Sequence, residues 1–103
     1  MKLNLKNPIL FFDIETTGLS SNMSYLYLIG CVYFKNGEPY LRQWFADGIE
    51  DEKELLIQFF TFLANYKVLI HYNGSGFDIP YLNAKCKRYQ QRYSFDTIKS
   101  IDI

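Results

Sequence analysis

The chain has 103 residues, of which 49% are hydrophobic and 18% aromatic, so it holds enough apolar side chains for one packed domain and is not a disordered chain. Its formal net charge is zero, so any attraction to nucleic acid or a membrane has to be local. The first residues, MKLNLKNP, lack the apolar core of a signal peptide, and residues 25–34 are too few to span a bilayer. The two cysteines, Cys31 and Cys86, lie far apart in apolar patterns, and we expect a reduced, cytoplasmic protein.

The first predicted element is a buried strand with two carboxylates at its end. The stretch ILFFDIETTGLS, residues 9–20, begins with four apolar residues and continues through Asp13 and Glu15 to a Thr-Thr-Gly turn. Side chains alternate faces along a strand, so the two acids share one face at a separation of roughly 7 Å. Two like charges at the mouth of a sheet are costly unless a cation lies between them, and a hard divalent metal is the simplest such cation.

The next segments predict an antiparallel meander and a helix. Residues 25–34 are strongly β-prone, the pair Asn36-Gly37 is typical of a type I′ hairpin, and residues 41–46 pair back as a third strand. Asp51 is placed to cap a helix, with Glu54 three residues on. The apolar residues of this helix recur at helical spacing and predict one buried face, formed by Leu55, Leu56, Phe59, Phe60 and Leu63.

A fourth strand and a second helix follow. Residues 67–73, KVLIHYN, form a mostly apolar strand, which we expect to lie parallel to an earlier strand because a helix precedes it. The loop NGSG leads into a helix over residues 77–91, with Pro80 near its start, and the tail from residue 93 has mixed β character. The predicted fold class is therefore α/β with a mixed sheet.

Three acids follow the ends of the first and fourth strands: Asp13, Glu15 and Asp78. If these strands are adjacent and parallel, the acids meet at one edge of the sheet, where two Mg²⁺ or Mn²⁺ ions can orient a water for attack on a phosphodiester. The alternatives are a solvated strand end for Asp13 and Glu15 and a helix N-cap for Asp78. The segments that carry these acids, FDIETTG and NGSGFD, are both long and both fall at strand ends, so the sequence favours a metal site.

The two sequence segments that carry these acids resemble motifs of a known family. FFDIETTGL, residues 11–19, and HYNGSGFDIPYL, residues 71–82, resemble the first and second motifs of the DEDD 3′-5′ exonucleases of the ribonuclease H-like superfamily. The chain is most similar to the bacterial YprB-type ribonuclease H-like domain, whose pattern includes a segment like SIDI, residues 100–103. The resemblance implies a ribonuclease H-like fold in which Asp13, Glu15 and Asp78 are catalytic residues and metal ligands. The residues that it implies for binding the 3′-terminal nucleotide and shaping the second-motif loop are Thr16, Thr17, Gly18, Leu19 and Asn73.

The resemblance also implies a missing part. These exonucleases carry a fourth acid, with a His or Tyr shortly before it, on a later helix, and we expect residues 1–103 to be a single domain truncated before that helix. His71 is expected to have a strand or core role. Asp102 either supports the metal site from a neighbouring strand or ends the chain in solvent. Residues 85–92, KCKRYQQR, either follow a phosphate backbone or form a solvated helix face.

The sequence therefore predicts a metal-dependent 3′-5′ exonuclease domain acting on the 3′ end of single-stranded DNA or RNA, with little activity as this chain alone. The alternative is an inactive module of the same fold that binds nucleic acid or a protein. A missing helix would leave apolar surface exposed, which favours a homodimer.

Overall fold

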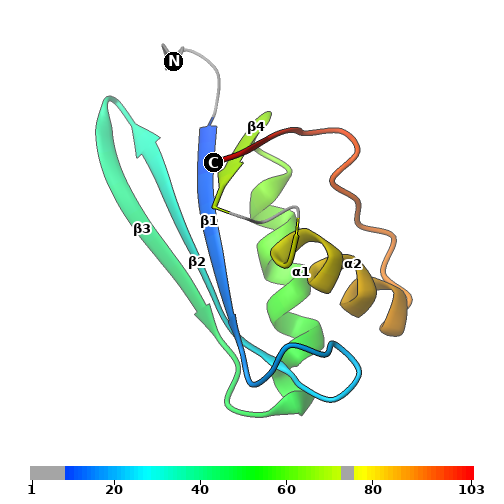
Figure 1. Ribbon diagram of the computed structural model, residues 1–103. Helices are drawn as coiled ribbons and strands as arrows, with labels where there is room; N and C mark the ends of the chain where they lie inside the picture. The colour runs from blue at the N-terminus through cyan, green and yellow to red at the C-terminus, as the bar shows by residue number, and fades with distance from the viewer. Residues whose placement is uncertain (1–8, 73–75) are drawn as a thin grey trace.

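The computed structural model describes residues 9–72 and 76–103. A single mixed sheet has the strand order β3-β2-β1-β4-β5, and both helices lie on one side of it (Figure 1). The elements in chain order are β1 (Ile9–Thr16), β2 (Leu26–Lys35), β3 (Glu38–Phe45), the 3₁₀ turn η1 (Ile49–Asp51), α1 (Glu52–Leu63), β4 (Val68–His71), α2 (Asp78–Arg88) and β5 (Lys99–Asp102). The predicted mixed sheet is confirmed, since β1 is antiparallel to β2, β2 is antiparallel to β3, and β4 is parallel to β1.

The hairpin between β2 and β3 turns at the predicted Asn-Gly pair. Asn36 has φ 54° and Gly37 has φ 78°, and two positive φ values in succession are what a type I′ turn requires. The ladder begins directly beside this turn, at Lys35 opposite Glu38. Strand β3 is consequently longer than the sequence predicted and includes Pro39, which is tolerated because β3 is an edge strand.

The core lies between the sheet and the helices. Leu10, Phe12 and Ile14 of β1 are buried on the helix side. Helix α1 buries all of the apolar residues predicted for its inner face: Leu55, Leu56, Phe59, Phe60 and Leu63. Asp51 occupies the predicted N-cap position but makes no capping hydrogen bond, because its carboxylate accepts the N–H of Asp47 instead.

The two parallel pairings are short, and beyond Phe11 the edge of β1 on the β4 side has no neighbouring strand. Strand β1 pairs with β4 only from Ile9 to Phe11, while its pairing with β2 continues to Thr16. The tail forms β5, parallel to β4, which lengthens the sheet by one strand. The start of α2 lies at this edge of β1, where the backbone of Ile14 is hydrogen-bonded to Asp78.

The sheet face opposite the helices is open and largely apolar. Phe34, Leu41 and Phe45 are 42%, 65% and 68% exposed on β2 and β3. Among the described residues, no helix is both long and apolar enough to cross a membrane.

Candidate active site

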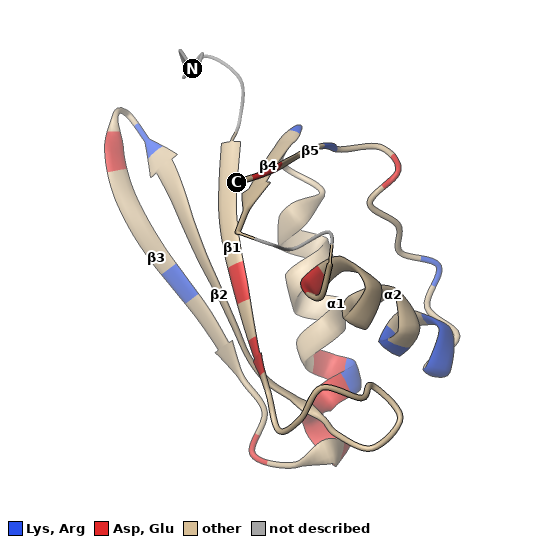
Figure 2. Cartoon of the chain, in the orientation of Figure 1, with Lys and Arg blue, Asp and Glu red and all other residues tan. Residues whose placement is uncertain are grey.

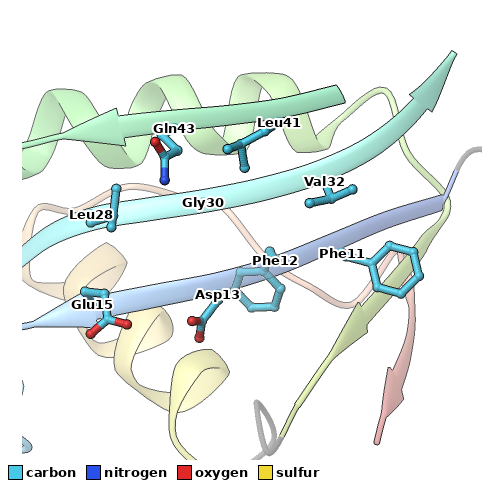
Figure 3. A pocket seen from close by; sticks show the side chains of 9 residues that line it. All are labelled: Phe11, Phe12, Asp13, Glu15, Leu28, Gly30, Val32, Leu41 and Gln43. Atoms are coloured by element: carbon cyan, nitrogen blue, oxygen red, sulfur yellow. The ribbon is translucent and has the colours of Figure 1, made fainter. Parts of the chain in front are cut away.

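Asp13 and Glu15 lie on the open face of the sheet, as the strand alternation predicts. Both are exposed, whereas Phe12, which precedes Asp13, and Ile14, which lies between the two acids, are buried in the core. Their carboxylates project to the same side of β1 and line a shallow cavity of about 310 Å³ (Figure 3). The cavity wall is otherwise mainly apolar, and its lining residues are Phe11, Phe12, Leu28, Gly30, Val32, Leu41 and Gln43.

Asp78 is the first residue of α2 and is only 6% exposed. It does not cap its own helix, because Phe77 occupies the cap position and α2 has no side-chain capping hydrogen bond. Instead the Asp78 carboxylate accepts a hydrogen bond from the backbone N–H of Ile14 at the free edge of β1. Its second oxygen, Oδ2, is buried and has no hydrogen-bond partner among the described residues.

The three acids interact electrostatically. Burial is the largest cause that raises the pKa of Asp78 to about 6, and the charge of Asp13 is the next. Glu15 and Asp102 raise this pKa further, whereas the hydrogen bond from Ile14 lowers it. The fold therefore holds a carboxyl group whose ionised form is disfavoured by burial and by the charges of other carboxylates, which is the electrostatic setting that a bound cation relieves.

The carboxylates of Asp13, Glu15 and Asp78 do not form a ready metal-binding cluster in this structure. Among the described residues, no three His, Cys, Asp or Glu side chains form a group that could hold a metal ion as they stand. The backbone positions nevertheless bring the three acids within electrostatic range, and Asp13 and Glu15 are exposed side chains that can change rotamer. The oxygen-only donor set and the unpartnered Asp78 Oδ2 fit a hard divalent cation.

The loop between β1 and β2 closes on itself beside the acids. The N–H of Thr17 donates to the carbonyl of Tyr25 at 3.0 Å, and the N–H of Tyr25 donates to Thr17 Oγ1 at 2.9 Å. Thr16 Oγ1 donates to the carbonyl of Gly18 at 2.6 Å. A cavity of about 200 Å³ lies between this loop and the start of α2, and it is lined by Leu19, Ser21, Gly76, Phe77, Pro80 and Tyr81.

Leu19 of this loop is 87% exposed. Of the residues implied for nucleotide binding, Leu19 lines this cavity, and Thr16, Thr17 and Gly18 directly precede Leu19 in the chain. Asn73 lies outside the described residues.

A family model of the RNase H superfamily matches residues 10–103. The chain belongs to the RNase H superfamily. The match takes in every element described above, including β5.

Solved structures of the same fold include DNA-processing enzymes. The family B DNA polymerase of Pyrobaculum calidifontis superposes with a TM-score of 0.76 at 20% identity, over 93% of this chain and 15% of the polymerase. Escherichia coli exonuclease I in complex with a dT13 oligonucleotide superposes with a TM-score of 0.71 at 12% identity, over 93% of this chain and 28% of the exonuclease. At these identities the likeness establishes the RNase H-like fold.

Two DNA polymerases share short segments of sequence with the chain. The polymerase of Methanocaldococcus jannaschii is 44% identical over 41 residues, and that of Ostreid herpesvirus 1 is 35% identical over 49 residues. The matched segments are 40% and 46% of this chain but only 2% and 3% of the polymerases. The RNase H superfamily domain thus corresponds to a small part of these relatives.

A buried polar network next to the loop was not predicted from the sequence. Glu52 and Lys85 are both fully buried, and Lys85 Nζ lies 3.2 Å from Glu52 Oε2. Both interpretations of residues 85–92, a contact with a phosphate backbone and a solvated helix face, are wrong for Lys85, because its ammonium is inside the protein. Lys87, Arg88 and Arg92 of the same segment are exposed, and basic residues gather at the C-terminal end of α2 (Figure 2). The signal available in the sequence was the position of Lys85, one residue before the buried Cys86 on the inner face of α2.

His71 and Asp102 lie on neighbouring strands. His71 is 3% exposed on β4, as expected for a strand residue, and its ring contacts Phe12 edge-on. Its Nδ1 lies 3.3 Å from Asp102 Oδ1, and its Nε2 is hydrogen-bonded to Ser100 Oγ. Asp102 is therefore tied to β4 rather than ending the chain free in solvent.

Neither cysteine is placed for catalysis. Cys31 and Cys86 are free and buried, and burial raises the pKa of the Cys31 thiol to about 12 and that of Cys86 to about 11. We expect both thiols to react with Ellman's reagent only on unfolding, since the thiolate is the reactive form. Release of thionitrobenzoate from the native protein at pH 8 within minutes would contradict this placement.

Proposed function

We propose that this RNase H superfamily domain is a divalent-metal-dependent 3′-5′ exonuclease domain acting on single-stranded nucleic acid. The observation that carries the proposal is the buried, unpartnered Oδ2 of Asp78, a residue whose pKa is raised first by burial and then by the charge of Asp13. A buried acid with a strongly perturbed pKa beside other acids is typical of a functional site. A purely structural carboxylate would be expected to have both oxygens satisfied.

In this proposal Asp13, Glu15 and Asp78 hold Mg²⁺ or Mn²⁺. When bound, such ions activate a water and neutralise charge on the phosphodiester. Asp78 is fixed by the Ile14 N–H, so it provides the rigid oxygen of the set, while Asp13 and Glu15 turn toward it from the exposed side of β1. The segment Thr16–Leu19 positions the 3′-terminal nucleotide, with the exposed Leu19 side chain available to pack against its base.

The neighbours support the substrate class. Exonuclease I structures of the same fold are described in complex with dT13 and dA16 oligonucleotides, and one as a zinc-bound complex with single-stranded DNA. Within the superfamily we place the chain nearest to the YprB-type domain, on the motifs FFDIETTGL, HYNGSGFDIPYL and SIDI. After α2, residues 89–103 contain the short strand β5 (Lys99–Asp102) and no further helix, so no helix there supplies the fourth acid of the exonuclease pattern. We therefore expect slow hydrolysis by this chain.

The open sheet face favours a second candidate function. Phe34, Leu41 and Phe45 are exposed there, close to the cavity that Asp13 and Glu15 line. An exposed apolar surface of this kind is typical of an interaction site. The alternative is a module that binds nucleic acid or a protein partner, including a second copy of the chain, without hydrolysing a bond.

One fluorescently labelled oligonucleotide can distinguish these two functions, because both its hydrolysis and its binding can be measured. We expect 5′-fluorescein-labelled oligothymidylate, incubated with the protein and Mn²⁺, to shorten slowly from its 3′ end in single-nucleotide steps. EDTA and the Asp13→Asn substitution should abolish the shortening, because each removes the metal site. Denaturing gels measure the products, and fluorescence anisotropy of the same strand measures binding.

Asp96→Asn is the matched control, since it removes one carboxylate from an exposed position after α2. Its product ladder should equal that of the wild type. Mn²⁺-dependent binding without shortening would favour the non-hydrolysing module. An oligonucleotide that is neither bound nor shortened, with Mn²⁺ or without it, would contradict the exonuclease and a module that binds nucleic acid, and would favour a module that binds a protein partner.

A further inference from the structure

We infer that the buried Glu52–Lys85 network is a positioning device, which sets the placement of Asp78 and of the loop between β1 and β2. The inference rests on the proposed function, because it assigns the network a role at the same site. Its residues touch neither the proposed ions nor the nucleic acid and act through the backbone that they hold.

The network joins three separate parts of the chain. Glu52, at the start of α1, accepts the backbone N–H of Leu26 through Oε2 at 2.7 Å. Lys85 of α2 lies against the same oxygen and donates to the carbonyl of Ser24 at 2.7 Å. The end of the loop is thus held from both helices at once.

Two tyrosine hydroxyls complete the connections. Tyr89 donates to Glu52 Oε1 at 2.5 Å, which ties the end of α2 to the start of α1. Tyr81 OH lies 2.8 Å from Ser24 Oγ, which ties the first turns of α2 to the loop. Ser24 Oγ in turn donates to the carbonyl of Ser20 inside the loop at 2.5 Å.

The contacts fall on the face of α2 that begins with Asp78. Residues 78, 81, 85 and 89 recur at intervals of three or four, so their side chains lie along one stripe of the helix. Three of these four side chains are anchored to the loop or to α1. Such anchoring restricts how α2 rotates about its axis and slides along it. The direction of the Asp78 carboxylate depends on both of these movements.

The polar side chains of the network fix the relative position of the helices and the loop more narrowly than apolar side chains would. Replacing a buried ion pair by apolar residues of similar volume is often neutral or stabilising, so the attraction between the two charges gives by itself little reason for an ammonium and a carboxylate here. Hydrogen bonds to the Leu26 N–H and the Ser24 carbonyl have fixed directions, whereas an apolar contact allows several packings. Residues that orient metal ligands in this way typically change metal affinity by about 10- to 100-fold when removed.

The test separates position from stability with Lys85→Met and the double variant Glu52→Leu/Lys85→Met. We expect the single variant to unfold at a lower temperature, because it leaves the Glu52 charge buried without a partner. The double variant should recover the part of the melting temperature that the unpaired Glu52 charge removes, although the Leu26 N–H and the Ser24 carbonyl stay buried without these partners. It should nevertheless bind Mn²⁺ at least about tenfold more weakly than the wild type in calorimetric titrations.

Amide hydrogen exchange of Ile14 in metal-free protein is the second readout, since this N–H donates to Asp78. We expect faster exchange at Ile14 in the double variant, with core amides unchanged. Tyr81→Phe removes only the hydroxyl that meets Ser24 and should accelerate Ile14 exchange in a protein that remains folded. Tyr40→Phe, at a 46% exposed tyrosine, is its matched control and should leave the exchange unchanged.

Wild-type exchange at Ile14 in both the double variant and Tyr81→Phe would overturn the positioning role, whatever the metal result. Wild-type Mn²⁺ affinity in the double variant would also overturn it. A wild-type protein that binds no Mn²⁺, together with faster Ile14 exchange in the variants, would contradict the proposed function and leave the positioning of Asp78 supported.

Discussion

Asp78→Asn should raise the stability of the metal-free protein at pH 7.5 by about 1 to 3 kcal/mol, although it removes a residue of the proposed site. The reason is that the folded protein holds Asp78 buried and facing Asp13, which raises its pKa to about 6. At neutral pH the ionised carboxylate is therefore a cost to folding that a neutral amide avoids. The asparagine can still accept the hydrogen bond from Ile14.

The pH dependence follows from the direction of this shift. The pKa of Asp78 is raised to about 6 on folding, so between about pH 4 and pH 6 the folded state binds more protons than the unfolded state. The contribution of Asp78 to stability then increases as the pH falls through this window. The advantage of Asp78→Asn should be largest above pH 7 and should largely disappear near pH 4.

Thermal unfolding in EDTA measures this, and an increase of about 1 kcal/mol corresponds to roughly 4 to 8 °C for a domain of this size. Adding Mn²⁺ should stabilise the wild type and leave Asp78→Asn unaffected, because only the wild type retains the ligand. Asp96→Asn is the control for the loss of one exposed negative charge. Equal melting temperatures of the wild type and Asp78→Asn in EDTA would contradict the electrostatic account of the site.

Phe59→Ala should cost about 3 to 5 kcal/mol of unfolding free energy, which is a large part of the roughly 5 to 15 kcal/mol of a typical domain. Phe59 is 0% exposed, and its ring centroid lies 5.7 Å from that of Phe12 and 5.9 Å from that of Trp44. It therefore joins α1 to β1 and β3. The truncation leaves a cavity between these elements and removes the aromatic contacts.

Phe45→Ala makes the same chemical change on the open face of the sheet, where Phe45 is 68% exposed. It should cost less than about 1 kcal/mol. Urea unfolding followed by tryptophan fluorescence compares the two, since Trp44 is buried beside Phe59. A similar loss from both substitutions would show that the helix side of the sheet is not the core.

The strands and helices were largely predictable because their signals are local. Alternation in FDIE sets the faces of Asp13 and Glu15, and the Asn36-Gly37 pair sets the hairpin, whatever the remainder of the chain does. The inner face of α1 follows from helical spacing in the same way. These features need no knowledge of which elements meet in space.

The parts that were not predicted depend on contacts between distant elements. Glu52 and Lys85 are both charged residues near helix ends, where exposure is the ordinary expectation, and their burial arises only because the loop ending at Leu26 brings unsatisfied backbone groups between them. The hydrogen bond from Ile14 to Asp78 likewise depends on β4 leaving the edge of β1 after Phe11. The chain places these groups together through its topology.

The candidate site was predictable in part. Local patterns named Asp13, Glu15 and Asp78, but their electrostatic contact required β1 and β4 to be parallel neighbours, which the structure confirms. Whether they hold a metal ion stays a prediction.

Calorimetric titration of Mn²⁺ into the metal-free protein tests that prediction most directly. We expect binding at millimolar or lower Mn²⁺ in the wild type and in Asp96→Asn, and its loss in Asp13→Asn and in Asp78→Asn, because a carboxylate oxygen is the ligand that each of the last two removes. Absence of binding in the wild type, or equal binding in the wild type and Asp13→Asn, would contradict a metal site at the end of β1.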